Sequence, residues 1–147
     1  MKIKAMLTAA SLLAVASPAI AHDERTPMSA DSIAEAKPLV EGFFRTLQAG
    51  DAAKAYNDLF SNTLMANKAL EVQNLVAQTN FIFQTYGSIV GWSLAESDCL
   101  TPTLCRVIYQ IDTNNGPVIL LLTLYRRTSG WMPTTIFVTD QTQTLFD

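Results

Sequence analysis

One stretch near the C-terminus, residues 104–140, constrains the fold of this chain more than any other. It contains three apolar runs rich in β-branched and aromatic residues, separated by two short turns that each end in glycine. This pattern predicts an antiparallel meander of three strands. The central run, Val118–Leu124, is apolar at nearly every position, whereas a strand with one solvated face would alternate. We therefore expect this strand in the middle of the sheet, covered on both faces.

The residues upstream of this stretch predict a first helix. Ser32 followed by Glu35 matches a capping box, and Gly50 supplies a stop after about Ala49. Pro38 would interrupt a helix interior, so we expect either one helix with a kink or a start nearer Glu35. The expected buried face has helical spacing and consists of Val40, Phe43, Phe44 and Leu47.

Two further helices and one strand are expected before the meander. Asp51 caps a short helix over 52–60, and a longer helix covers about 67–86. The expected buried stripe of the longer helix consists of Val72, Leu75, Val76, Thr79, Phe83 and Tyr86. A strand follows at 88–96, with a bulge or bend at Gly91. Helices that precede a run of antiparallel strands indicate an α+β domain. We expect three N-terminal helices packed in the concave face of a curved four-stranded antiparallel sheet, which together form a cone.

The N-terminus has the pattern of a secretory signal peptide. Lys2 and Lys4 precede an apolar run over 5–15, and the small-residue triplet that ends at Ala21 predicts cleavage there. A membrane anchor is the alternative, but the apolar run is shorter than the ~20 residues that cross a bilayer. We therefore expect an exported protein, periplasmic or extracellular, with no membrane attachment after cleavage.

Cleavage would divide the chain into a signal peptide (1–21), a flexible lead-in (22–31), the cone-shaped domain (32–140) and a C-terminal tail (141–147). The signal peptide holds two of the 10 Lys and Arg residues and no acid, which leaves eight bases against 13 acids, a mature net charge of −5. An acidic chain without a basic stripe does not favour nucleic acid as a partner. The one histidine, His22, would become the mature N-terminus.

The two cysteines, Cys99 and Cys105, predict a disulfide. An oxidising compartment favours a bridge over a metal or redox site. The five residues between them join two strands, which allows the Cβ approach of ~4 Å that a bridge requires. Two free thiols are the alternative. Zinc would need histidine or further cysteine ligands, so we expect neither a metal nor a cofactor.

Three segments resemble the nuclear-transport-factor-2-like superfamily. Residues 43–56 combine two phenylalanines, a Gly-Asp pair and a short Ala-rich helix, and Tyr86-Gly87 ends the third helix. Residues 120–131 join a long apolar strand to two arginines and a Gly-Trp turn. The likeness spans about 32–139 and is closest to small secreted bacterial members of unassigned function. It implies a cone of helices in a bent sheet and little about activity, because this fold carries many chemistries.

The resemblance also implies an apolar pocket in the cone. Eight aromatic side chains are candidates to line it: Phe43, Phe44, Tyr56, Phe83, Tyr86, Trp92, Tyr109 and Phe137. The alternative is that these rings fill the core. The expected function is that of a non-catalytic module that binds a small apolar ligand or another protein.

Enzymes that share the resemblance imply an alternative function. Ketosteroid isomerases and related dehydratases place Asp, His and Tyr inside the cone, and act by acid–base chemistry on small apolar substrates. This chain departs from that pattern, because its one histidine lies at the mature N-terminus. Asp58 and Tyr56 remain as acid–base candidates, and we assign no catalytic residue.

The central strand also predicts a partner surface. In Val118–Leu124, alternate residues point to opposite faces, and only one of these faces can pack on the helices. One face carries Val118, Leu120, Leu122 and Leu124, and the other carries Ile119, Leu121 and Thr123. A bare apolar face favours a symmetric homodimer through the outer side of the sheet. The alternative is that either the lead-in at 29–32 or the C-terminal tail, with Leu145 and Phe146, covers this face.

Overall fold

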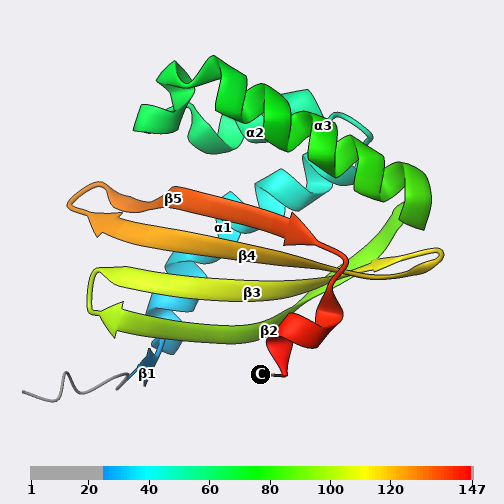
Figure 1. Ribbon diagram of the computed structural model, residues 1–147. Helices are drawn as coiled ribbons and strands as arrows, with labels where there is room; N and C mark the ends of the chain where they lie inside the picture. Colours follow the sequence, from blue (N-terminus) through cyan, green and yellow to red (C-terminus); the bar gives the residue numbers. More distant parts are fainter. Residues whose placement is uncertain (1–24, 147) are drawn as a thin grey trace, which may run out of the picture.

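The computed structural model describes residues 25–146, which form three α-helices on one face of an antiparallel sheet (Figure 1). We call this face of the sheet the inner face and the opposite one the outer face. The predicted signal peptide, its cleavage site and His22 lie outside the described residues. The elements are β1 (Thr26–Pro27), α1 (Ala30–Gln48), α2 (Ala52–Phe60), the 3₁₀ turn η1 (Leu64–Asn67), α3 (Ala69–Tyr86), β2 (Ile89–Thr101), β3 (Leu104–Thr113), β4 (Gly116–Arg127), β5 (Gly130–Thr139) and the 3₁₀ turn η2 (Thr142–Leu145).

Helix α1 begins at Ala30, earlier than the start predicted from the capping box. The Ser29 hydroxyl caps it by accepting a hydrogen bond from the Ser32 backbone N–H at 3.2 Å. Pro38 lies inside the helix, and Pro38 and Ala34 are both exposed, so water can reach the Ala34 carbonyl that the missing N–H leaves without a partner. The helix buries all four expected side chains and Ala36.

Helix α2 occupies the predicted residues, and the Asp51 carboxylate caps it by accepting from the Lys54 backbone N–H at 2.9 Å. The third predicted helix is confirmed as α3, which begins two residues later than predicted and ends at Tyr86 as predicted, and the separate turn η1 precedes it. The Thr63 hydroxyl accepts from a backbone N–H of η1 and so starts this separate turn.

The sheet has five strands in the order β1-β2-β3-β4-β5, all antiparallel, rather than the predicted four. The extra strand β1 comes from the predicted flexible lead-in over 22–31, and Thr26 pairs with Cys99. Met28 explains the difference: its side chain is 5% exposed in the core, and its backbone N–H donates to the Ser97 carbonyl at 3.2 Å. The described part of the lead-in therefore belongs to the fold.

Strand β2 is longer than predicted and reaches the cysteine pair. The pairing register shifts between Ile89 and Gly91, which confirms the predicted irregularity there. At the far end of the hairpin Cys99 lies opposite Cys105, and their sulfur atoms are bonded at 2.04 Å. The predicted disulfide is confirmed, and it joins adjacent strands of the sheet.

Strand β4 forms the centre of the core. On the inner face Val118, Leu120, Leu122 and Leu124 are at most 1% exposed, because they pack beneath the helices. On the outer face Ile119 is only 3% exposed. The prediction of a strand covered on both sides is therefore confirmed on the inner face and at Ile119, whereas Leu121 and Thr123 on the outer face are only half-buried.

Candidate functional site

Five of the eight predicted pocket aromatics meet in one cluster around α1, which joins it to the sheet on one side and to α2 on the other. The Phe44 ring stacks on Trp92 at 5.1 Å and meets Tyr109 edge-on at 5.2 Å, whereas Phe43 meets Tyr56 edge-on at 5.1 Å. Phe44 and Tyr56 are completely buried. Trp92 and Tyr109 also line a small surface pocket of about 260 Å³ beside α1. The cluster therefore acts mainly as core packing, with two rings that reach the surface.

The other three predicted aromatics lie elsewhere. Phe83 and Tyr86 are half-buried on α3, and the Tyr86 hydroxyl donates to the Asp140 carboxylate at 3.0 Å. This hydrogen bond raises the pKa of Tyr86 above its usual range. Phe137 lies on the outer face and is 53% exposed. The eight side chains do not share one site.

The two acid–base candidates are also separate. The Tyr56 hydroxyl forms a buried hydrogen bond of 2.7 Å with the Thr79 hydroxyl, which joins α2 to α3. Burial raises the pKa of Tyr56 to about 12, because the phenolate would lose its solvation. Asp58 points to solvent on α2 and pairs with Lys54 one turn earlier. The structure therefore brings no acid to Tyr56.

Helix α3 has an unusual surface. Among its 18 residues only Val72 and Thr79 are buried, and Glu71 is the one charged residue. Leu70 and Phe81 are 68% and 70% exposed. Charged side chains are depleted in the centres of binding interfaces, so a long exposed helix with one charge is a candidate binding element. A groove borders α3 on each side.

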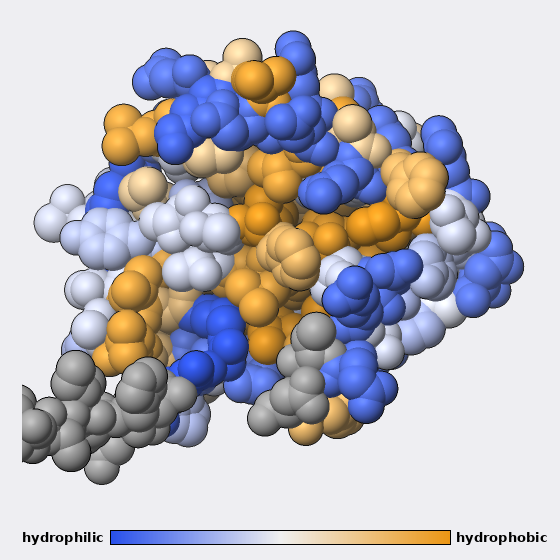
Figure 2. Space-filling model, viewed as in Figure 1, coloured by the Kyte–Doolittle hydropathy of each residue, from blue (hydrophilic) through white to orange (hydrophobic). Residues whose placement is uncertain are grey.

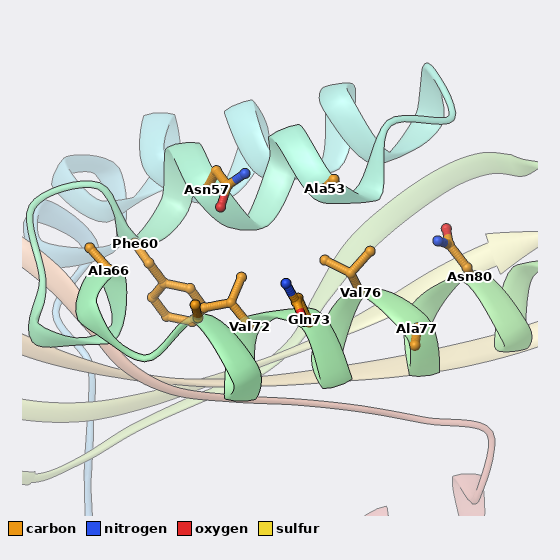
Figure 3. A pocket seen from close by; sticks show the side chains of 10 residues that line it. Ala53, Asn57, Phe60, Ala66, Val72, Gln73, Val76, Ala77 and Asn80 are labelled. Atoms are coloured by element: carbon orange, nitrogen blue, oxygen red, sulfur yellow. The ribbon is translucent and has the colours of Figure 1, made fainter.

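The first groove lies between α2 and α3 and has a volume of about 550 Å³ (Figure 3). In Figure 3, Asn57 points from α2 toward α3, and Val76 points back toward α2. The walls combine apolar and carboxamide side chains and carry no charge. The lining residues are Ala53, Asn57, Phe60, Ala66, Ala69, Val72, Gln73, Val76, Ala77 and Asn80. We call this the helix groove.

The second groove lies on the opposite side of α3, against β5, and has a volume of about 740 Å³. Phe60 and Ala77 line both grooves. The remaining lining residues are Met65, Lys68, Glu71, Asn74, Leu75, Gln78, Thr134, Thr135 and Ile136. We call this the edge groove, because β5 is the last strand in the order of the sheet.

The outer face of the sheet presents a third surface (Figure 2). Apolar side chains gather in the middle of this view. A cleft of about 830 Å³ contains Ile108, Leu121 and Phe137. The Arg106 guanidinium borders it and donates two hydrogen bonds to the Asp98 carboxylate, at 3.0 and 2.8 Å. The turn η2 packs against β4 and contributes Leu145 to the cleft, so the tail covers part of this face (Figure 1).

The side chains that could hold a metal are dispersed. No group of three His, Cys, Asp or Glu residues within the described part of the chain is arranged to bind a metal ion, and the disulfide occupies both cysteines.

The two arginines at the end of β4 contact other residues. The Arg126 guanidinium lies 2.9 Å from the Glu35 carboxylate and over the Trp131 ring. Its neighbour Arg127 donates to the Asn62 carbonyl at 3.2 Å. None of the helices between residues 25 and 146 is long and apolar enough to cross a membrane.

Sequence reasoning missed both grooves beside α3. The helical stripe Val72–Tyr86 predicted a buried face, and the structure leaves Leu75, Val76 and Phe83 only half-buried. The near absence of charge over residues 69–86 is a sequence signal for an exposed binding helix, although it does not place the grooves. Comparisons with protein-family models, with curated proteins and with solved structures find no match for this chain.

Proposed function

We propose that this protein is an exported, non-catalytic binding domain that holds a neutral ligand in the helix groove. The observation that carries this proposal is the composition of the groove walls. Alanine, valine and phenylalanine side chains supply the apolar surface, and Asn57, Gln73 and Asn80 supply carboxamides that both donate and accept hydrogen bonds. A volume of about 550 Å³ lies within the range of small-molecule sites.

The absence of charge in the walls defines the ligand class. A charged ligand that enters the groove would lose its hydration and find no side chain of opposite charge there, which costs free energy. A ligand with an apolar body and neutral amide or hydroxyl groups would satisfy the three carboxamides and cover the valine and phenylalanine surfaces. We therefore propose a small, mainly apolar, uncharged ligand.

The acid–base alternative has less support. Its two candidate side chains lie in different environments, because Tyr56 is completely buried and Asp58 is exposed to solvent beside Lys54. A general base must lie within hydrogen-bond reach of the proton that it removes. Neither Tyr56 nor Asp58 lines the helix groove.

Matched variants of α3 test the proposal. The probe is N-phenyl-1-naphthylamine, a neutral apolar dye whose fluorescence rises in an apolar site. The variant Gln73→Trp fills the helix groove, and the control Gln78→Trp places the same side chain on the other side of the same helix. We expect saturable dye binding that Gln73→Trp weakens by at least about tenfold, roughly 1.4 kcal/mol. Equal loss in both variants, or none in Gln73→Trp, would refute the site.

We also propose export by cleavage after Ala21 and membership of the nuclear-transport-factor-2-like superfamily. The disulfide supports an oxidising compartment. The order of three helices before an antiparallel meander, with α1 packed on the inner face, supports the cone architecture. Phe137, half-exposed on the outer face, supports a homodimer through that face as a second mode of interaction.

A further inference from the structure

We propose that the open edge of β5 binds an extended peptide segment of another protein, which adds a strand to the sheet in the edge groove. Strand β5 pairs with β4 on one side and has no neighbouring strand on its other side among the described residues. Every second residue of such an edge points its backbone N–H and C=O away from the sheet. These groups can pair with any extended backbone, so affinity does not require a particular sequence.

The structure limits where this pairing can occur. Pro133 has no N–H and interrupts the edge. Next to it the register shifts, because Thr135 pairs with Thr123 and Pro133 pairs with Leu124. The regular edge therefore begins at Thr134 and ends with the strand at Thr139, and the edge groove runs beside its first three residues, 134–136. The six residues 134–139 extend over about 20 Å, enough for a peptide of similar length.

The edge groove provides a wall for the side chains of the added strand. Phe60, Met65 and Leu75 form apolar surface on the helical side, opposite Ile136. Because side chains alternate along a strand, every second side chain of the peptide would point toward α3. The hydrogen bond from Tyr86 to Asp140 joins the C-terminal end of α3 to the segment after β5, beyond the residues that line the groove.

The charges in the groove narrow the partner further. Lys68 and Glu71 line it near the beginning of α3, and neither forms an ion pair with another residue in the described range. An occupant with a carboxylate beside Lys68 would complete one of these pairs. Because Lys68 and Glu71 have opposite charges, we take the partner to be an extended segment with alternating apolar residues whose acidic end lies beside Lys68.

Other occupants fit less well. The chain before Arg25 enters the fold at β1, four strands from β5, or about 19 Å at 4.8 Å per strand. If residues 1–21 are removed as proposed, three residues precede Arg25, and they extend for about 10 Å at most. A second copy would have to pair through the edge of its own β5, and its occupancy of this edge would depend on protein concentration.

The test uses a synthetic hexapeptide that alternates valine and threonine and carries a C-terminal aspartate, added to the mature protein. Amide hydrogen exchange, followed by NMR, should slow for residues within 134–139. An analogue with alternate backbone nitrogens methylated should bind roughly 5- to 30-fold more weakly, because it loses one or two backbone hydrogen bonds. Equal binding of the two peptides would overturn the proposal, as would protection confined to another part of the chain.

The two tryptophan variants separate this proposal from the helix groove. Gln78→Trp fills the edge groove and should abolish protection by the peptide, whereas Gln73→Trp should leave it unchanged. Binding of the dye should be weakened by Gln73→Trp and unchanged by Gln78→Trp. The experiments can therefore refute one of the two sites without refuting the other. Slow exchange of residues 134–139 that depends on protein concentration without peptide would also overturn the proposal, because a second copy would then occupy the edge.

Discussion

Replacement of Tyr56 by phenylalanine tests how α3 is held on the rest of the fold. The Tyr56 hydroxyl and the Thr79 hydroxyl lie 2.7 Å apart, and the two residues are 0% and 1% exposed. Tyr56→Phe removes one partner and leaves the Thr79 hydroxyl buried without it. A buried hydroxyl that loses its hydrogen-bond partner lowers the free energy of unfolding by about 1–3 kcal/mol. The double variant Tyr56→Phe/Thr79→Val removes both groups and should recover much of this loss.

The same hydroxyl gives the protein a dependence on alkaline pH. Its pKa is about 12 in the folded protein and 10.0 in the unfolded chain. Below pH 10 both states keep the proton, so stability is unaffected. Between pH 10 and pH 12 the unfolded state releases the proton and the folded state retains it, so stability falls as pH rises. The full difference of two units corresponds to about 2.7 kcal/mol. Tyr56→Phe lacks this loss.

Urea unfolding at pH 7 and pH 11 measures both effects. At pH 7 we expect Tyr56→Phe to unfold at lower urea concentration than the wild type, and at pH 11 we expect the gap to be smaller. The control is Tyr125→Phe, a change in a tyrosine that is 44% exposed. A gap for Tyr56→Phe below about 0.5 kcal/mol at pH 7, the range of ordinary surface changes, would contradict the reasoning. If the difference in stability between Tyr56→Phe and the wild type were the same at both pH values, this would contradict the raised pKa of the buried Tyr56 hydroxyl.

Four further predictions concern other parts of the chain. Thiol titration of the denatured, unreduced protein should find no free thiol, and replacing Cys99 and Cys105 by serine should cost about 2–2.5 kcal/mol; two titratable thiols would refute the bridge in solution. The intact mass of the exported protein should lack residues 1–21, and a retained first methionine would exclude cleavage. Asp58→Asn should leave binding of the dye unchanged, because Asp58 lies outside the helix groove; a loss of binding with unchanged melting temperature would instead implicate that carboxylate. Light scattering near 10 µM, about the middle of common affinities, should give a dimer mass that Phe137→Ser reduces, and a clean monomer for the wild type would leave the tail as the cover of the outer face.

Parts of the fold were predictable because single residues determine them locally. The Asp51 side chain can cap only the helix that follows it, and α2 spans the predicted residues. The meander was predictable because β4 lacks the alternation of a half-exposed strand, and its inner face is buried throughout. The cysteine pair required only adjacent strands joined by a short turn, and Cys99 lies opposite Cys105.

Other features depend on contacts between distant segments. Strand β1 has two residues, too few for any periodicity, and it forms because Met28 enters the core beside β2. The placement of Phe137 was predictable in principle. Ile136 and Val138 on either side of it are buried, so alternation directs Phe137 to the outer face. The prediction that Phe137 lines a pocket followed from its aromatic side chain and did not take this alternation along the strand into account.

The grooves beside α3 could not be predicted, because they depend on how far the helix lies from its neighbours. The Val72–Tyr86 stripe describes which side of α3 faces inward, and that orientation holds, since Val72 and Thr79 are its buried residues. The stripe does not say how closely α3 packs. Phe60, the last residue of α2, lines both grooves, so the side chain of a neighbouring element contributes to the space on each side of α3. Because the hydrogen bond between Tyr56 and Thr79 joins α3 to α2 from within the core, the position of that helix, and with it the width of both grooves, depends on a contact that lies in neither of them.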